Sequence, residues 1–194
     1  MLRHPSMLLG IAFLVAGCVP VTEPLADPDK SEPDKRLLGK WRAKDESEGP
    51  TIDSPLVKGN PKGLMRSGNQ ARSRWFFTTS IGKHTYANVC FNRDGERPNF
   101  DKEGAFEKWK KSNNRCYFIV RYLLDGDKLT IDFGHEPAVE KVMKAQQIEL
   151  DNNIPYQVHP YKTPPGLLAR YLEKNGPETI FTGTPVLVLR RSKD

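Results

Sequence analysis

Alternating apolar and polar positions divide much of the chain into short strands joined by local turns. The strongest strand signal is 115–124, followed by the tight-turn signal Asp125-Gly126-Asp127 and a return strand over 128–133. Upstream, aromatic and β-branched content predicts a strand over 74–79, whose antiparallel partner is 84–91. Further short strands are predicted over residues 37–42, 179–182 and 186–191.

Helical periodicity is confined to short stretches. It predicts helices over 136–147 and 164–174, and one or two helical turns within 100–111. Residues 44–73 are rich in Gly, Pro, Ser, Asp and Lys, which predicts a long irregular loop. We therefore expect a mainly β fold: an antiparallel meander that closes into a small barrel, with two short helices in the C-terminal half.

Such a barrel has an apolar interior, which the strand pattern lets us assign. We expect its lining, and hence a binding site for a small hydrophobic ligand or lipid, to consist of Phe77, Val89, Phe118, Val120, Leu129 and Ile131. The mouth is expected near the basic loop of residues 56–74.

The beginning of the chain carries a different pattern. Arg3 precedes an unbroken apolar run from Met7 to Gly17, which is too short to span a membrane and has the charge order of a secretory signal. The run ends in Val15-Ala16-Gly17-Cys18, which resembles the lipoprotein signal of bacteria. The resemblance implies that 1–17 is a signal peptide, that Cys18 is lipidated, and that the protein is anchored in the cell envelope. Val19 in place of an Asp favours the outer membrane.

The stretch after Cys18 is unlike the rest of the chain. Residues 19–35 contain four prolines and five acids, so we expect 18–35 to be a lipidated Cys followed by an extended, solvated tether. Residues 36–194 then form a single β-rich domain.

Charge is unevenly distributed between these parts. The whole chain has 30 Lys and Arg against 24 Asp and Glu, and the domain alone holds 27 against 19, a net charge of +8. No acid lies between Ser54 and Arg93. This window suggests a surface that contacts anionic lipid or a partner protein. Its expected contact residues are Lys58, Lys62, Arg66, Arg72 and Arg74.

Two cysteines are left once Cys18 is assigned to lipid. In an exported domain Cys90 and Cys116 are expected to pair as a disulfide. The strand alternation opposes easy pairing, because Cys116 shares a face with Phe118 whereas Cys90 is out of phase with Val89. A bridge would need a bulge or a strand end.

The two ends of the domain resemble lipocalins and related calycin-like barrels. These families begin with Gly-x-Trp on the first strand, matched by Gly39-Lys40-Trp41, and often place an Arg of the last strand across that Trp, which Arg190 or Arg191 could supply. The resemblance implies a small barrel and, less directly, a ligand-binding role. The second conserved motif of true lipocalins is missing and two helices are inserted.

No catalytic motif accompanies these features. His84, His135 and His159 are far apart, without Cys or acid at zinc spacing, so we expect neither a metal site nor a cofactor. A nucleophile elbow, a phosphate loop and a nucleic-acid recognition motif are missing from the sequence. Three hypotheses follow: a non-enzymatic lipoprotein that binds a ligand, an interaction protein with a basic face, and an enzyme whose site assembles only on folding.

Overall fold

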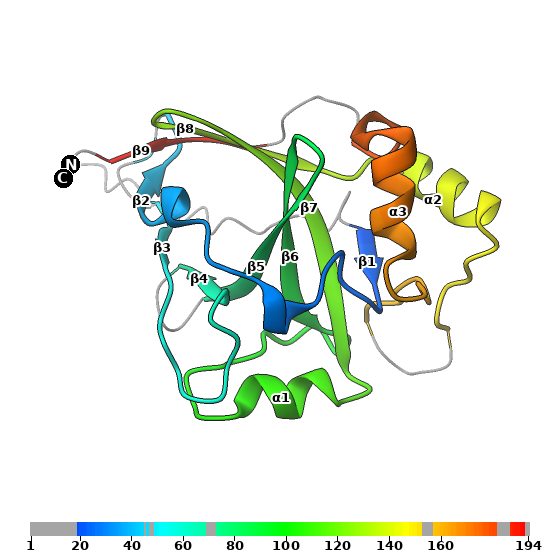
Figure 1. The fold of residues 1–194 in the computed structure, drawn as a ribbon, viewed down its shortest axis with the longest axis horizontal. Coiled ribbons are helices and arrows are strands. Elements are labelled where there is room, and N and C mark those ends of the chain that lie inside the picture. The colour runs from blue at the N-terminus through cyan, green and yellow to red at the C-terminus, as the bar shows by residue number, and fades with distance from the viewer. Residues whose placement is uncertain are drawn as a thin grey trace, which may run out of the picture.

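An antiparallel β-barrel of eight strands is the centre of the structure (Figure 1). The structure is a computed structural model that describes residues 19–44, 46, 49–68, 73–152, 157–181 and 187–192. The barrel strands are β2 (Gly39–Arg42), β3 (Thr51–Asp53), β4 (Met65–Ser67), β5 (Arg74–Ile81), β6 (His84–Asn92), β7 (Arg115–Asp125), β8 (Lys128–Phe133) and β9 (Leu187–Arg191). Their order is β7-β6-β5-β4-β3-β2-β9-β8, and pairing of β8 with β7 closes the barrel. The predicted fold class is confirmed.

The four long strands, β5 to β8, are paired in two hairpins. In the β7–β8 hairpin Asp125 pairs with Lys128, and Gly126 adopts the positive φ (53°) that its tight turn requires. In the β5–β6 hairpin Ile81 pairs with His84. Both hairpins lie where the sequence predicts them.

Strand β7 separates two hydrophobic cores because both of its faces are buried. Val120 and Tyr122 point into the barrel, whereas Tyr117 and Ile119 point out of it. The interior core comprises Leu37, Trp41, Ile52, Met65, Phe76, Ala87, Val120, Tyr122, Leu129 and Leu189. The outer core centres on Trp75, Phe77, Tyr86, Cys90, Phe100, Phe106, Trp109, Tyr117, Ile119 and Phe181.

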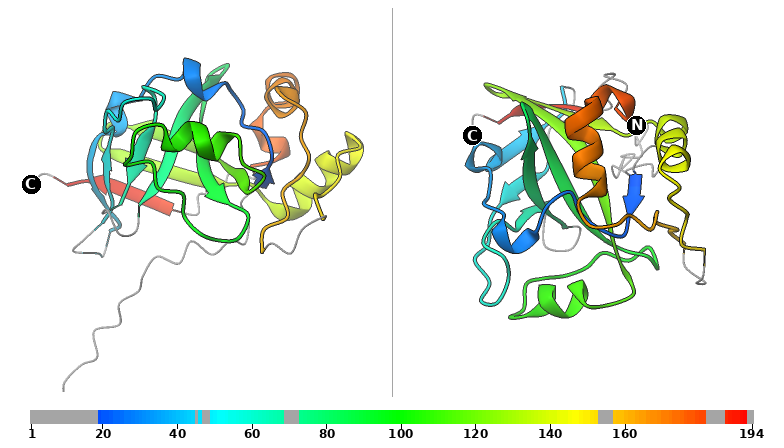
Figure 2. Two further views of the ribbon diagram at one scale, coloured as in Figure 1. Left: turned by 90° about the horizontal axis from the view of Figure 1, so that it is seen from below. Right: turned by 45° about the vertical axis from the view of Figure 1, so that its right-hand side comes forward.

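Three helices cover the outer core. They are α1 (Ala105–Lys110), α2 (Glu136–Ala145) and α3 (Leu167–Asn175). Each contributes apolar side chains to the outer core, such as Phe106 from α1, Met143 from α2 and Leu172 from α3. Figure 2 shows α1 across the strands of the barrel, with α2 and α3 beside β1 at the other end. Much of the outer face of β5, β6 and β7 is therefore buried.

The expected solvated tether is wrong for the described part of 18–35. Residues 19–21 form strand β1 (Val19–Val21), which pairs antiparallel with β7 next to the point where β8 ends. Val21 and Leu25 are buried in the outer core, and the backbone N–H of Leu25 donates to the buried Asn88 side chain at 2.7 Å. The prolines and acids of this segment hide two apolar side chains, Val21 and Leu25, that pack against the outside of the barrel.

Three further differences concern short elements. Strands β3 and β4 lie within the predicted loop 44–73, and each is three residues long. The predicted strand over 179–182 is not formed in its described part, where a 3₁₀ turn, η4 (Pro177–Thr179), precedes Ile180. The chain before β2 contains two more 3₁₀ turns, η1 (Pro28–Lys30) and η2 (Lys35–Leu37).

Candidate functional site

The barrel interior holds a partly open apolar cavity of about 160 Å³. Its lining comes from every barrel strand except β2 and β9, together with Leu37 of η2. The lining residues are Leu37, Ile52, Ser67, Arg74, Phe76, Ala87, Val89, Phe91, Phe118, Val120, Tyr122, Leu129, Ile131 and Phe133. An engineered apolar cavity of about 150 Å³ in another protein binds benzene, so a cavity of this size suits a compact organic molecule.

Five of the six side chains predicted to line the barrel do so. Val89, Phe118, Val120, Leu129 and Ile131 face the cavity. The assignment of Phe77 is wrong: it is fully buried in the outer core, with its ring 6.1 Å from that of Tyr117, and its neighbour Phe76 lines the cavity instead. Three aromatic residues in succession, Trp75 to Phe77, carry no alternation from which the phase of β5 could be determined.

One end of the cavity is closed by the segment that precedes β2. Leu37 is buried there and lines the cavity. The Tyr122 hydroxyl donates to the Asp34 carboxylate at 2.9 Å, and the Thr78 hydroxyl donates to the carbonyl of Glu32 at 3.3 Å. Burial raises the pKa of Tyr122, so this hydroxyl stays protonated and acts as a donor at neutral pH.

The same end carries the Trp–Arg pair suggested by the resemblance to lipocalins. The Arg191 guanidinium lies 4.4 Å from the ring centroid of Trp41 and donates to the carbonyls of Leu38 and Arg36. Gly39 lies at φ 123°, and a Cβ there would come within 2.9 Å of Arg191 Nη1. The Gly in Gly39-Lys40-Trp41 thus makes room for the arginine, and the residue at the stacking position is Arg191.

At the other end the lining becomes partly exposed and gains its polar members. Ser67 and Arg74 are register partners on β4 and β5, and both are half-buried. The Arg74 guanidinium lies over the Phe91 ring, 5.8 Å from its centroid. Its Nη1 atom is buried and has no hydrogen-bond partner among the described residues. The sequence predicts Arg74 only as one cation of a basic surface, although its alternation with Phe76 places both on one face of β5.

The other expected contact cations are largely neutralised. Arg66 forms ion pairs with Asp53 at 2.6 Å and Asp101 at 2.9 Å, and Lys58 pairs with Glu103 at 3.0 Å. Lys62 lies on the rim of a shallow polar pocket with Asp29 and Glu32. Arg72 is outside the described residues. Acidic side chains outside the acid-free window therefore neutralise part of its positive charge.

The predicted disulfide is wrong, because Cys90 and Cys116 are both buried free thiols. Cys90 is opposite Tyr117, and Cys116 is opposite Phe91, so the two cysteines are one register step apart and point to opposite faces. Burial raises the pKa of Cys90 well above its usual value and that of Cys116 to about 12. Neither thiol is a nucleophile at neutral pH. Cys18 and the signal region are outside the described residues.

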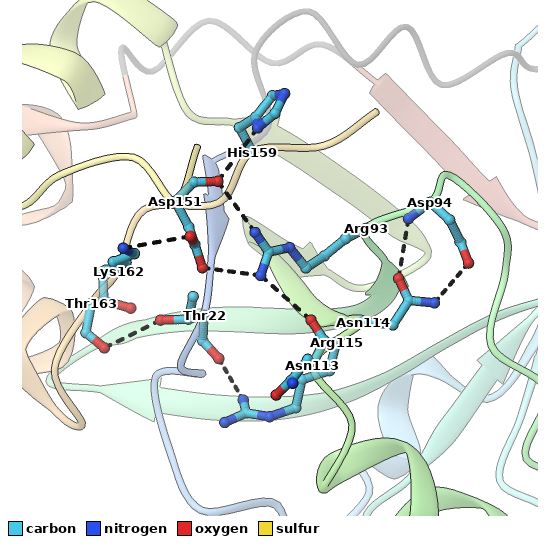
Figure 3. Close-up of polar contacts among 10 residues, drawn as sticks. All are labelled: Thr22, Arg93, Asp94, Asn113, Asn114, Arg115, Asp151, His159, Lys162 and Thr163. Atoms are coloured by element: carbon cyan, nitrogen blue, oxygen red, sulfur yellow. Dashed lines mark hydrogen bonds and ion pairs between the residues drawn. The ribbon is translucent and has the colours of Figure 1, made fainter. Parts of the chain in front are cut away.

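A polar cluster ties β1, Asp151 and residues 159–163 to the ends of β6 and β7 (Figure 3). Arg93, 4% exposed, forms an ion pair with Asp151 at 3.0 Å and donates to the Asp151 carbonyl. Arg115 donates to the carbonyl of Thr22 and pairs with Glu23 at 2.7 Å. Both arginines form ion pairs within the protein, so the cluster holds β1 and Asp151 against the ends of β6 and β7.

The three histidines of the domain lie apart from one another. His84 and His135 lie on different elements, and His159 approaches only the backbone carbonyl of Asp151, at 3.4 Å. Within the part of the chain that the structure describes, no group of three or more His, Cys, Asp or Glu side chains is placed to hold a metal ion. Among the same residues, no helix has the length and apolar character needed to cross a membrane.

Comparisons with protein-family models, with curated proteins and with solved structures found no match to this chain. The site is therefore interpreted from its own geometry.

Proposed function

We propose that this protein is a non-enzymatic lipoprotein of the bacterial envelope whose barrel binds a compact hydrophobic molecule. The observation that carries the binding role is the apolar cavity inside the barrel. Protein interiors are normally packed to crystal-like density, and voids larger than a water molecule are few. A cavity of about 160 Å³ enclosed by Phe, Val, Leu and Ile side chains is a place where an apolar ligand gains contacts that the protein lacks.

The anchoring role is supported by Val15-Ala16-Gly17-Cys18 and has a structural consequence. Strand β1 begins at Val19, the residue after the proposed lipidation site. A lipid on Cys18 would thus join the barrel with almost no free linker, and the domain would lie close to the membrane surface. Metabolic labelling with an alkyne fatty acid tests this: the wild type should be labelled and Cys18→Ser should not. A labelled Cys18→Ser variant would contradict the assignment.

Ligand binding is tested by titrating the protein with benzene and observing side-chain methyl groups by NMR. We expect shifts at Val89, Val120, Leu129 and Ile131, which line the cavity. Val89→Phe should fill the cavity and abolish the shifts of the other three. Val188→Phe is the matched control, because Val188 lies on the outer face of β9 and is 37% exposed. Loss of binding in both variants, or in neither, would contradict a site inside the barrel.

A further inference from the structure

The cavity contains one feature that a purely apolar ligand does not explain. Among the described residues, Arg74 is the sole cation in its lining, and apart from Ser67 and Tyr122 the other described lining side chains are hydrocarbon. The Tyr122 hydroxyl is already engaged with Asp34. The guanidinium is always protonated in proteins, and its Nη1 is buried without a partner among the described residues. A buried donor left unpaired is destabilising, so its presence calls for a physical explanation.

Every other buried or half-buried arginine among the described residues has a carboxylate partner. Arg66, Arg93 and Arg115 pair with Asp53, Asp151 and Glu23, respectively. Arg121 pairs with Asp132 and Glu178, and Arg191 approaches Asp127 at 3.5 Å. Among the described residues, Arg74 is thus the half-buried arginine that lacks a carboxylate partner, and it is also the one that lines the cavity.

We propose that Arg74 binds the head group of an anionic ligand, and that the ligand is a compact apolar monocarboxylic acid. The inference rests on the proposed binding role of the cavity and adds the chemical class of the ligand. A single cation in an apolar wall is neutralised by a single negative charge, whereas a dianionic phosphate would leave one charge uncompensated in a dry site. Carboxylates also match the geometry of the guanidinium fork.

The gradient of exposure along the cavity sets the orientation of the ligand. Arg74, Ser67 and Phe91 are half-buried, whereas Leu37 and Leu129 are buried at the opposite end. The carboxylate therefore lies at the open end against the Arg74 guanidinium, with the Ser67 hydroxyl on the neighbouring strand as a second donor. The apolar body points toward Leu37. The Phe91 ring under the guanidinium holds the cation in place.

The volume limits the size of the acid. A cavity of about 160 Å³ accepts a benzene-sized body, whereas a long acyl chain would have to extend out of the barrel. Benzoate is therefore a suitable probe, and benzamide is its neutral counterpart of the same shape. The two differ in the charge that Arg74 would recognise.

Isothermal titration calorimetry with benzoate and benzamide tests the inference. The wild type should bind benzoate about 10-fold or more tightly than benzamide, because hydrogen bonds to charged groups are the stronger ones. Arg74→Met should bring the two affinities to within about 2-fold, since it removes the charge and keeps an apolar side chain. Arg190→Met, on the exposed face of β9, makes the same change in net charge and should keep the preference.

Different results separate this inference from the proposed function. Benzamide binding without any preference for benzoate in the wild type would overturn the role of Arg74 and leave the cavity as a binding site. A preference that survives in Arg74→Met would also overturn it. If neither probe nor benzene binds the wild type, the proposed binding role itself fails. The wild-type comparison does not depend on the folding of any variant, and Arg74→Gln provides a second test if Arg74→Met is unstable.

Discussion

The two cores of this protein share three strands and differ in how completely they are filled. In the outer core, rings interlock at close range: Phe100 lies 5.1 Å from Phe106, and Trp109 lies 5.3 Å from Tyr117, both edge to face. Its polar groups are engaged as well, since Trp109 Nε1 donates to Asn92 at 2.7 Å. The interior core keeps a cavity of about 160 Å³ and a guanidinium nitrogen with no hydrogen-bond partner among the described residues.

The difference shows which core serves stability and which serves binding. Three helices, η4 and the N-terminal segment are laid over one face of the sheet, and their aromatic side chains exclude water there. The same helices leave the interior untouched. A barrel whose outer face provides a second core can keep an incompletely filled interior, because the fold does not depend on that interior alone.

Truncating the same residue type in each core should produce the largest single loss of stability. Phe106→Ala removes a fully buried ring from the outer core and should lower the free energy of unfolding by about 4 kcal/mol. Phe118→Ala should lower it by about half as much, because the Phe118 ring already faces the cavity on one side. Urea denaturation measures both values. A larger loss for Phe118→Ala would contradict the distinction.

The two kinds of arginine give a second comparison, in which the larger loss is slightly smaller than that of Phe106→Ala. Arg93→Met removes the ion pair of the largely buried Asp151 carboxylate, whose pairing with Lys162 at 3.5 Å is longer, and should cost about 3 kcal/mol of unfolding free energy. Arg74→Met removes an unpaired donor and should leave stability unchanged or raise it by up to about 1 kcal/mol. Thermal unfolding of the two variants under one condition provides the comparison. Equal destabilisation would show that Arg74 has a structural role.

The closed end of the barrel gives a third test. Arg191→Met removes the cation over Trp41 and two hydrogen bonds to backbone carbonyls, and should lower the free energy of unfolding by about 2 kcal/mol. Arg190→Met alters the neighbouring exposed residue and should change stability by less than about 0.5 kcal/mol. Near-ultraviolet circular dichroism should change for Arg191→Met alone. The reverse pattern would place the stacking arginine at 190.

The smallest expected effect is a pH dependence at the same end. Hydrogen bonds from Arg36, opposed by burial and helped by one from Tyr122, hold the pKa of Asp34 below its usual value. This carboxylate therefore contributes stability at pH values above its unfolded pKa of about 4, and the contribution is lost as pH falls through the folded pKa. We expect less than about 1 kcal/mol. Asp34→Asn should flatten the acid limb of the stability curve; an unchanged limb would refute the assignment.

The sequence predicts well the elements that carry their own signal. Strands β7 and β8 were located because a long apolar run, an Asp-Gly turn and an alternating partner coincide there. The even apolar content of β7 reflects burial on both faces, a state that alternation cannot resolve. The same ambiguity produced the error at Phe77.

Elements formed by their neighbours were missed. Strand β1 is three residues long and contains Pro20, and its place depends on a free edge of β7 beyond the end of β8. Strands β3 and β4 are equally short, and they form by pairing with each other and with their neighbours between β5 and β2. The sequence predicts most of the apolar lining of the cavity. It does not predict that Arg74 belongs to this lining, because a cation in a basic loop normally faces solvent.

A crystal structure of the protein with 4-bromobenzoate tests the central claim most directly. The bromine gives an anomalous signal that locates the ring independently of its shape. We expect a single strong bromine peak inside the barrel, on the Leu37 side of the cavity, with the carboxylate against the Arg74 guanidinium. A bromine peak confined to the outer surface, or a carboxylate that points away from Arg74, would contradict it.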